Sequence, residues 1–289
     1  MKQRLRDGST IEFKGKQDRM LEKLYGNIFG RLLLKVLTRP FISKVAGVFL
    51  SSRFSCMLIK PFIEKNNIDM SLYEETNYKS YNDFFCRKIK TQVRPVDFTP
   101  KSLISPCDSK LTVFKITDAT RFVIKQTEYS VASLLQNEAL AQEYKNGYAL
   151  IFRLSVDDYH RYCYIDDAEK EKTVTIHGKL HTVNPIANDY FPIYKENTRT
   201  YSVLHSKNFE DVIMMEVGAL LVGKIVNHHN NTEPVQRGQE KGYFEFGGST
   251  VVVLLKENTV VIDEDILKNS EEDYETVVKF GEKIGAKGM

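Results

Sequence analysis

The first quarter of the chain has the hydrophobic spacing of a helix. Apolar residues recur there at intervals of three and four, at Leu21, Leu24, Ile28 and Leu32. Pro40 interrupts the pattern, because proline cannot continue a helix from within it. Further apolar stripes cover residues 41–53 and 57–64. The pattern therefore predicts an N-terminal helical arm over residues 18–65.

From Leu103 onwards the pattern changes to short runs rich in β-branched and aromatic residues, which is typical of strands. These runs cover residues 111–114, 122–124, 148–154, 173–176, 212–217 and 220–226. One helix is expected among them, over residues 131–145 and capped by Ser130, and a short helix is expected before them, over residues 81–87 and capped by Ser80 or Asn82. The sequence predicts an α+β protein, in which an N-terminal amphipathic helical arm is followed by a mostly antiparallel β core.

The chain is expected to divide into an arm, residues 1–65, and a β-rich domain, residues 66–289. Its 289 residues carry a net charge of +3, but residues 1–62 alone carry +9, which leaves −6 for the remainder. A basic arm indicates an anionic partner. The apolar stripes beside the basic residues favour a membrane surface over nucleic acid. An amphipathic helix packed on the protein's own core has the same periodicity and stays open as an alternative.

No apolar run approaches the ~18 residues of a transmembrane helix, and no signal peptide follows Met1. Four cysteines occur without the paired spacing of a zinc or redox site, so reduced thiols are expected. Neighbouring His228 and His229 have no suitably spaced third ligand, so no metal is expected. These observations predict a peripheral protein on the cytoplasmic face of the cell membrane.

The tetrapeptide Gly247-Gly248-Ser249-Thr250 lies between two strand-like runs, residues 242–246 and 251–255. A serine that follows two glycines is placed like a residue whose own peptide bond reacts, because glycine allows a strained turn. Asp108 and His160 complete the residue types of a proton relay, in which histidine deprotonates serine and aspartate fixes the histidine tautomer. One residue of each type is a weak signal on its own.

The motifs along the chain together resemble those of phosphatidylserine decarboxylases of the prokaryotic type. The resemblance runs from about Tyr81 to Gly285, and its order and spacing make it specific. It rests on residues 84–87 with 94–95, 105–108, 158–161, 178–180 with 183–185, 197–199, 217–223, 241–244 and 246–250.

The resemblance implies a self-processing, pyruvoyl-dependent enzyme with a relay of Asp108, His160 and Ser249. Attack by the Ser249 hydroxyl on Gly248 would separate a β chain, residues 1–248, from an α chain, residues 249–289, and leave a pyruvoyl group in place of Ser249. This group would form a Schiff base with phosphatidylserine and release CO2, giving phosphatidylethanolamine. The two chains would form one unit, and the resemblance suggests that this unit dimerises.

Two positions depart from the family pattern. Cys163 stands where the family often has a second histidine, and Gly247 stands where leucine is common. We therefore expect His160 to serve both self-cleavage and decarboxylation.

Asn197 and Arg199 are candidates for binding the phosphate or carboxylate of the substrate, because arginine recognises such groups through a charged fork. A polar surface turn would explain the same residues equally well.

Two other functions stay open. The first is a Ser/His/Asp hydrolase acting on a lipid ester, although the sequence around Ser249 lacks the G-x-S-x-G elbow. The second is a catalytically inactive relative that only binds membranes, which the replacement at Cys163 would explain.

Overall fold

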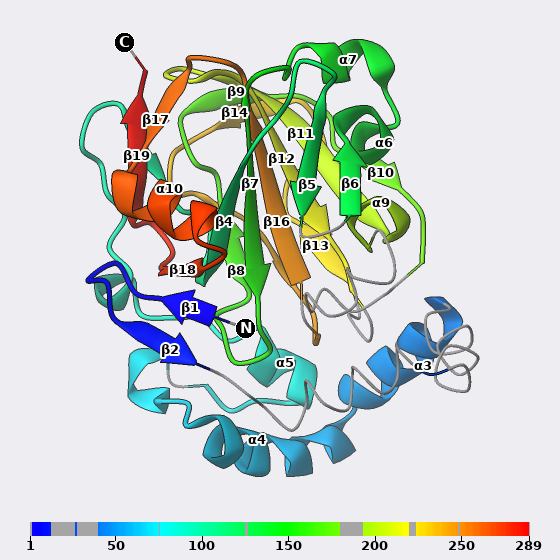
Figure 1. Ribbon diagram of the computed structural model, residues 1–289. Helices are drawn as coiled ribbons and strands as arrows, with labels where there is room; N and C mark the ends of the chain where they lie inside the picture. The colour runs from blue at the N-terminus through cyan, green and yellow to red at the C-terminus, as the bar shows by residue number, and fades with distance from the viewer. Residues whose placement is uncertain are drawn as a thin grey trace.

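The computed structural model describes residues 2–12, 27, 40–74, 76–124, 127–179, 193–219, 224–247 and 249–288. Within these residues, an 11-stranded and mostly antiparallel sheet forms the centre of the molecule (Figure 1). Its order is β14 (Glu233–Val235), β9 (Ala168–Lys170), β11 (Arg199–Ser206), β12 (Glu210–Val217), β16 (Ser249–Leu255), β7 (Tyr148–Leu154), β4 (Ser109–Lys115), β18 (Glu275–Val278), β1 (Lys2–Arg4) and β2 (Thr10–Glu12), with β10 (Val174–Ile176) pairing with β11.

Strand β16 lies in the middle of this sheet, hydrogen-bonded to β12 on one side and to β7 on the other. All seven of its residues are buried. A strand covered on both faces needs apolar residues at consecutive positions, which explains the unbroken run of valine and leucine from residue 251 to 255. The sheet therefore holds Ser249, the first residue of β16, in its interior.

Three smaller sheets complete the β structure of the described residues. They contain β13 (Ile225–Asn227), β15 (Glu240–Phe244) and β8 (Arg161–Cys163); β17 (Val260–Ile262), β19 (Lys283–Lys287) and β3 (Ser102–Ile104); and β5 (Arg121–Ile124) with β6 (Thr127–Ser130).

The helices gather in separate places around the central sheet. One group lies together at one end of the molecule (Figure 1) and contains α3 (Pro40–Leu50), η1 (Arg53–Leu58), α4 (Ile59–Asn66) and α5 (Tyr81–Phe85). The others are η2 (Met70–Leu72), η3 (Thr91–Val93), α6 (Val131–Leu135), α7 (Glu138–Gln142), α9 (Ile193–Glu196) and α10 (Glu264–Glu271). The prediction of an α+β fold is confirmed.

The helical arm is confirmed where it can be compared, over residues 40–66. Helix α3 begins at Pro40, whose missing N–H is unneeded at a first helical position. The apolar stripe from Leu21 to Leu32 lies outside the described residues. No helix of the described part of the chain is long and apolar enough to cross a membrane.

Helix α5 has one of the two predicted residues as its N-cap. The Ser80 hydroxyl accepts a hydrogen bond from the Asp83 amide at 3.1 Å, so Ser80 and not Asn82 is the N-cap. The Asn82 side chain instead donates to the Ser51 hydroxyl at 2.9 Å and links α5 to the arm.

The single helix expected over residues 131–145 is in fact two. Helix α6 ends where Gln136 takes a left-handed conformation with φ of 51°, and Asn137 then caps α7 by accepting from the Leu140 amide. A left-handed residue ends a helix, and an asparagine beside it favours a new start. The predicted cap at Ser130 is confirmed, since its hydroxyl accepts from the Ser133 amide.

The N-terminus also differs from the helical region expected over residues 1–65, because residues 2–12 form a β-hairpin. Strand β1 pairs in parallel with β18, more than 270 residues later in the chain. Arg6 then forms ion pairs with Asp263, Asp265 and Glu282. Part of the basic excess of the arm is thus neutralised inside the protein.

Candidate active site

Ser249 lies at the start of β16 and is completely buried. Its backbone pairs with Leu154 of β7, whereas its hydroxyl oxygen has no hydrogen-bond partner. Buried hydroxyl groups nearly always have a partner, so an exception needs an explanation. A reactive side chain held in a prepared position is one such explanation.

His160 lies between β7 and β8 and is also buried. Its backbone carbonyl accepts from the Phe244 amide at 3.0 Å, and its ring lies 4.2 Å from the ring of Phe85. Nδ1 lies 2.9 Å from the carbonyl oxygen of Asp158, so Nδ1 carries the proton and donates it. Nε2 is buried without a hydrogen-bond partner and is therefore the unprotonated nitrogen.

Burial lowers the pKa of His160 to about 3, because the charged imidazolium would lose its hydration. The positive charges of Arg87 and Lys110 lower this pKa further. Hydrogen bonding to the backbone of Asp158 and of Gly247 acts in the opposite direction and raises it. His160 is consequently neutral at physiological pH, the state that a general base needs.

The structure brings His160 to the backbone of Gly247, two residues before Ser249. The unpartnered Nε2 of His160 and the unpartnered hydroxyl of Ser249 both belong to this buried region, although no hydrogen bond joins them. Hydrogen bonds of a catalytic relay are often longer before the reaction, so this geometry is compatible with the predicted pair.

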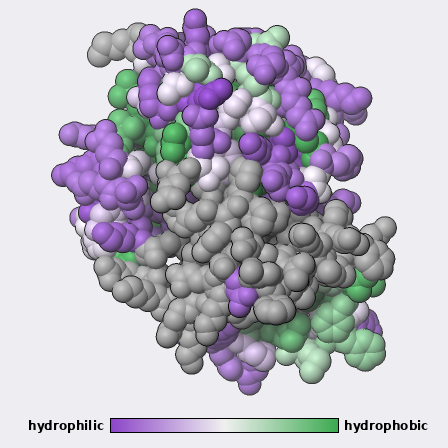
Figure 2. Space-filling view, turned by 45° about the vertical axis from the view of Figure 1, so that its right-hand side comes forward, coloured by the Kyte–Doolittle hydropathy of each residue, from purple (hydrophilic) through white to green (hydrophobic). Residues whose placement is uncertain are grey.

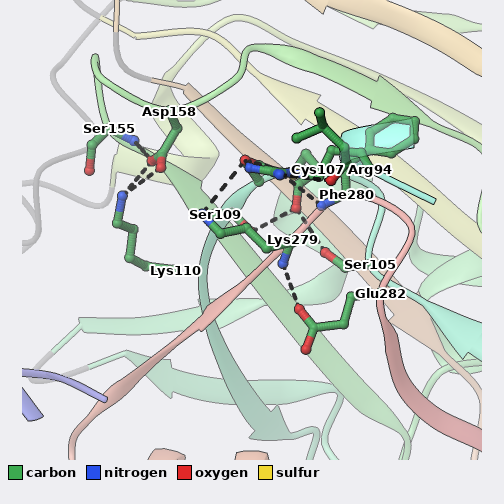
Figure 3. A network of polar contacts seen from close by, with 12 residues as sticks. Arg94, Ser105, Cys107, Ser109, Lys110, Ser155, Asp158, Lys279, Phe280 and Glu282 are labelled. Atoms are coloured by element: carbon green, nitrogen blue, oxygen red, sulfur yellow. Dashed lines mark hydrogen bonds and ion pairs between the residues drawn. The ribbon is translucent and has the colours of Figure 1, made fainter. Parts of the chain in front are cut away.

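Asp108 lies at the same end of the sheet, one residue before β4. Since β7 separates β4 from β16, the backbones at Asp108 and Ser249 are about 10 Å apart, two strand spacings. The Asp108 carboxylate accepts from Arg94 at 2.7 Å and from the Phe280 amide at 2.8 Å (Figure 3 shows both donors). It makes no hydrogen bond to His160, whose tautomer is fixed by the Asp158 carbonyl instead. The relay role of Asp108 stays a prediction.

Asp158 begins the motif of residues 158–161, but the sequence predicts no separate role for its carboxylate, which the structure shows to be buried. It forms an ion pair with Lys110 at 2.6 Å and accepts from the Ser155 amide at 2.7 Å (Figure 3). Burial raises its pKa, and the Lys110 charge opposes this. The pair ties the loop before β8 to β4 and so positions His160. Its position two residues before His160 was the available signal.

Cys163 is fully buried in β8, and its amide donates to the Pro106 carbonyl at 2.9 Å. Burial raises the pKa of its thiol well above the ordinary range, so the thiol keeps its proton. Cys163 therefore cannot replace a histidine as an acid–base group at neutral pH.

Asn197 and Arg199 are buried and do not lie in a surface turn. The Arg199 guanidinium donates to four backbone carbonyls, those of Ser133, Leu134, Lys195 and Asn197. Asn197 donates to the Gly218 carbonyl at 2.7 Å. Their donors thus connect α6 and α9 to the sheet. The predicted contact with substrate is untested, and these bonds do not favour it.

Comparison with known proteins places this site in a family. The family model described as phosphatidylserine decarboxylase matches residues 81–286, which include every residue of the site. The chain belongs to the phosphatidylserine decarboxylase family. It is 51% identical over 267 residues to phosphatidylserine decarboxylase proenzyme 2 of Clostridium acetobutylicum, covering 92% of this chain and 91% of that protein.

Two further relatives agree. The phosphatidylserine decarboxylase proenzymes of Clostridium botulinum (strain 657 / Type Ba4) and Clostridium tetani are each 42% identical to this chain, over 275 and 274 residues. The alignments cover 93% of this chain in both cases, and 93% and 92% of the two relatives.

These similarities confirm the family expected from the motifs. The phosphatidylserine decarboxylase family consists of pyruvoyl-dependent carboxy-lyases, so the predicted enzyme class and cofactor are confirmed with it. The hydrolase alternative has no support from these matches.

Proposed function

We propose that this chain is a proenzyme that cuts itself between Gly248 and Ser249 and then decarboxylates phosphatidylserine to phosphatidylethanolamine. The observation that carries the proposal is the pair of buried, unpartnered groups, Ser249 Oγ and His160 Nε2, at the Gly247–Ser249 segment. Membership of the decarboxylase family supports it.

Self-cleavage begins with attack of Ser249 Oγ on the carbonyl carbon of Gly248, while His160 Nε2 accepts the hydroxyl proton. The amide becomes an ester, and the nitrogen of Ser249 becomes a free amine. Loss of the α-proton of Ser249 then breaks the ester bond, which leaves a carboxylate on Gly248 and dehydroalanine at position 249. Water replaces its nitrogen, ammonia leaves, and the product is an N-terminal pyruvoyl group.

Alternation along β16 limits what can stabilise the oxyanion formed in the first step. Side chains of consecutive strand residues point to opposite faces, so the Thr250 hydroxyl is directed away from the face of Ser249. Backbone amides near the cleavage point are the donors left for this task.

The residues present at Ser249 fit the pyruvoyl group, since they leave the side-chain oxygen without competing partners. When formed, the group supplies an electron sink for the bond to CO2. His160 is our candidate for returning a proton to the α-carbon of the substrate. Phe85 and Phe246, whose ring centres lie 5.2 Å apart, cover the region around His160 and Ser249 and exclude water.

The helical end of the molecule is our proposed membrane-docking surface. Phe54 and Met57 of η1 are 81% and 74% exposed, and Val48 and Phe49 of α3 are exposed beside them. Figure 2 shows a hydrophobic area in the lower part of the molecule, at the height of these helices in Figure 1. Exposed apolar side chains of this size mark interaction surfaces.

Basic residues surround this docking surface, with Arg53, Lys60 and Lys65 all exposed. Apolar insertion and attraction to anionic lipid then act together. We accordingly propose that the enzyme works on the cytoplasmic face of the membrane. We also expect a homodimer, which sedimentation of the purified protein would test.

Intact-mass measurement of the purified protein tests the proposal. We expect a large chain, residues 1–248, and a 41-residue chain, residues 249–289, whose N-terminus is a ketone. A Ser249→Ala variant should give one chain of 33.3 kDa and no phosphatidylethanolamine. Active protein that runs as one intact chain would support the hydrolase. Uncut protein that binds vesicles without decarboxylation would support the inactive relative.

A further inference from the structure

Arg87 is a buried cation without a neutralising carboxylate in the described part of the chain. It follows α5 and is 2% exposed. Its Nη2 donates to the Tyr73 hydroxyl at 3.2 Å, and its Nη1 lies 3.5 Å from the Phe84 carbonyl, at the limit of a hydrogen bond. Its Nε has no hydrogen-bond partner. Burying an unpaired charge is costly, so a function is the natural explanation.

The surroundings of Arg87 are aromatic and contain a second unpartnered group. The guanidinium carbon lies 4.3 Å from the centre of the Tyr73 ring and 4.9 Å from that of Phe84. Such contacts stabilise the faces of a cation but bring no formal negative charge. The hydroxyl of Tyr78, whose ring packs edge-on against Phe84 at 5.4 Å, is buried without a partner. We call Arg87, Tyr73 and Tyr78 the Arg87 cluster.

The other buried arginines of the described residues are satisfied. Arg153 forms two hydrogen bonds to the Glu275 carboxylate, and Arg199 donates to four backbone carbonyls. Half-buried Arg94 likewise pairs with Asp108. Arg87 is the exception among these four. Its unused donor and that of Tyr78 are what an anion would need.

We propose that the Arg87 cluster binds the phosphodiester of the substrate headgroup, an inference that rests on the function proposed above. Arg87 is close to the reacting centre, because Phe85, two residues earlier, contacts the ring of His160 at 4.2 Å. The charge of Arg87 also contributes to lowering the pKa of His160.

The substrate carries two anionic groups, and the chemistry distinguishes them. The carboxylate loses its charge as CO2 leaves, so an arginine bound to it would stabilise the substrate more than the transition state. The phosphodiester keeps its charge throughout the reaction, so an arginine can bind it equally well in the substrate and in the transition state. A planar guanidinium with a free N–H suits two phosphate oxygens.

The position of the cluster also fits a substrate that arrives from a membrane. Helix α5 is attached to η1, because the Tyr81 amide donates to the Ser55 hydroxyl at 2.8 Å. Exposed Phe54 and Met57 belong to that same η1. Residues 76 and 77 beside Tyr78 are exposed, so the cluster lies close to the surface. A lipid held at the docking surface would therefore have its headgroup near Arg87.

The test compares processed wild-type protein with Arg87→Met, which removes the charge at similar volume, and Tyr78→Phe, which removes one hydroxyl. Arg121→Met is the matched control, since Arg121 is an exposed arginine paired with Glu128. We expect Arg87→Met to cleave itself completely and to raise KM for phosphatidylserine vesicles at least about tenfold with kcat little changed. Tyr78→Phe should give a smaller rise, and the control none.

A binding measurement gives a readout independent of turnover. Glycerophosphoglycerol, a soluble phosphodiester without amine or carboxylate, should bind the wild type in calorimetry and bind Arg87→Met at least about tenfold more weakly. Propionate serves as the carboxylate probe and should not distinguish the two proteins. Propionate binding that depends on Arg87 would overturn the assignment to phosphate.

The remaining outcomes are equally decisive. Unchanged KM and probe binding in Arg87→Met would overturn the inference while leaving self-cleavage intact. Loss of folding in Arg87→Met, with Tyr78→Phe behaving as wild type, would show that Arg87 is structural. Absence of cleavage in the wild type would instead refute the proposed function.

Discussion

Burial of His160 in its neutral form makes a quantitative prediction about stability. The pKa of this histidine is 6.5 in the unfolded chain and about 3 in the folded protein. As the pH falls below 6.5, the unfolded chain binds a proton that the folded protein does not bind. Stability is therefore fully present above pH 6.5 and is lost as the pH falls toward 3. From pH 7 to pH 5 the loss due to this one group is about 2 kcal/mol.

The measurement uses Ser249→Ala protein, which remains one chain, so that dissociation of a cleaved chain does not contribute to the unfolding transition. Removing an unpartnered buried hydroxyl should not destabilise the protein. A second variant adds His160→Asn, whose amide can still donate to the Asp158 carbonyl but does not titrate. Urea unfolding at pH 7 and pH 5 should show that the protein with His160 loses about 2 kcal/mol more than the variant that lacks it. This corresponds to about 1 M in the urea midpoint.

A matched control is available at a second histidine. His205 is exposed, and hydrogen bonding to Asp211 raises its pKa, so its contribution has the opposite sign and favours the folded state at low pH. His205→Asn should therefore steepen the loss of stability on acidification, whereas His160→Asn should flatten it. Equal slopes for proteins with and without His160 would refute the argument that this histidine is buried and neutral.

Three further predictions concern other parts of the chain. Lys241→Met should lower the free energy of unfolding in urea by about 3–5 kcal/mol, because Lys241 and Glu216 form a fully buried ion pair. Adding Glu216→Leu should recover most of this stability, and equal losses in the single and double variants would contradict the argument. Arg6→Ala should cost about 1–3 kcal/mol and release the 249–289 chain of the cleaved protein at lower urea, as followed by size-exclusion chromatography; unchanged retention would contradict it. Replacing Phe54 and Met57 by serine should weaken binding to anionic vesicles at least about tenfold in sedimentation while self-cleavage proceeds normally; equal sedimentation would remove η1 from the docking surface.

Much of the fold could be predicted from the sequence because its long strands carry a strong local signal. Residues 148–154 and 212–217 are mostly apolar, interrupted by Arg153 and Glu216, and both lie in strands next to β16. The hairpin of residues 2–12 could not be predicted in this way. Its strands have three residues each, and their stability comes from pairing with β18, which is remote in sequence.

The site could be predicted only as far as the motifs extend. The sequence context predicts catalytic roles for His160 and Ser249, and these stay predictions. The structure shows that both residues are buried with unpartnered atoms. The environment of each group was out of reach. The contact of Lys110 with Asp158 depends on the pairing of β4 with β7, and that of Arg94 with Asp108 depends on how the end of η3 packs against the start of β4. No local pattern contains that information.

The fold also explains how the proposed cut before Ser249 would leave the new terminus in place. Strand β16 is hydrogen-bonded over Thr250–Leu254 to β12 and over its whole length to β7. The rest of the 249–289 chain contributes β18 to the same sheet and β19 to the sheet with β3. A strand that is hydrogen-bonded along both edges keeps its first residue in position, and the precision of a catalytic group depends on such support. Placing the reactive residue at the first position of a central strand therefore allows the peptide bond to be broken without losing the site that it creates.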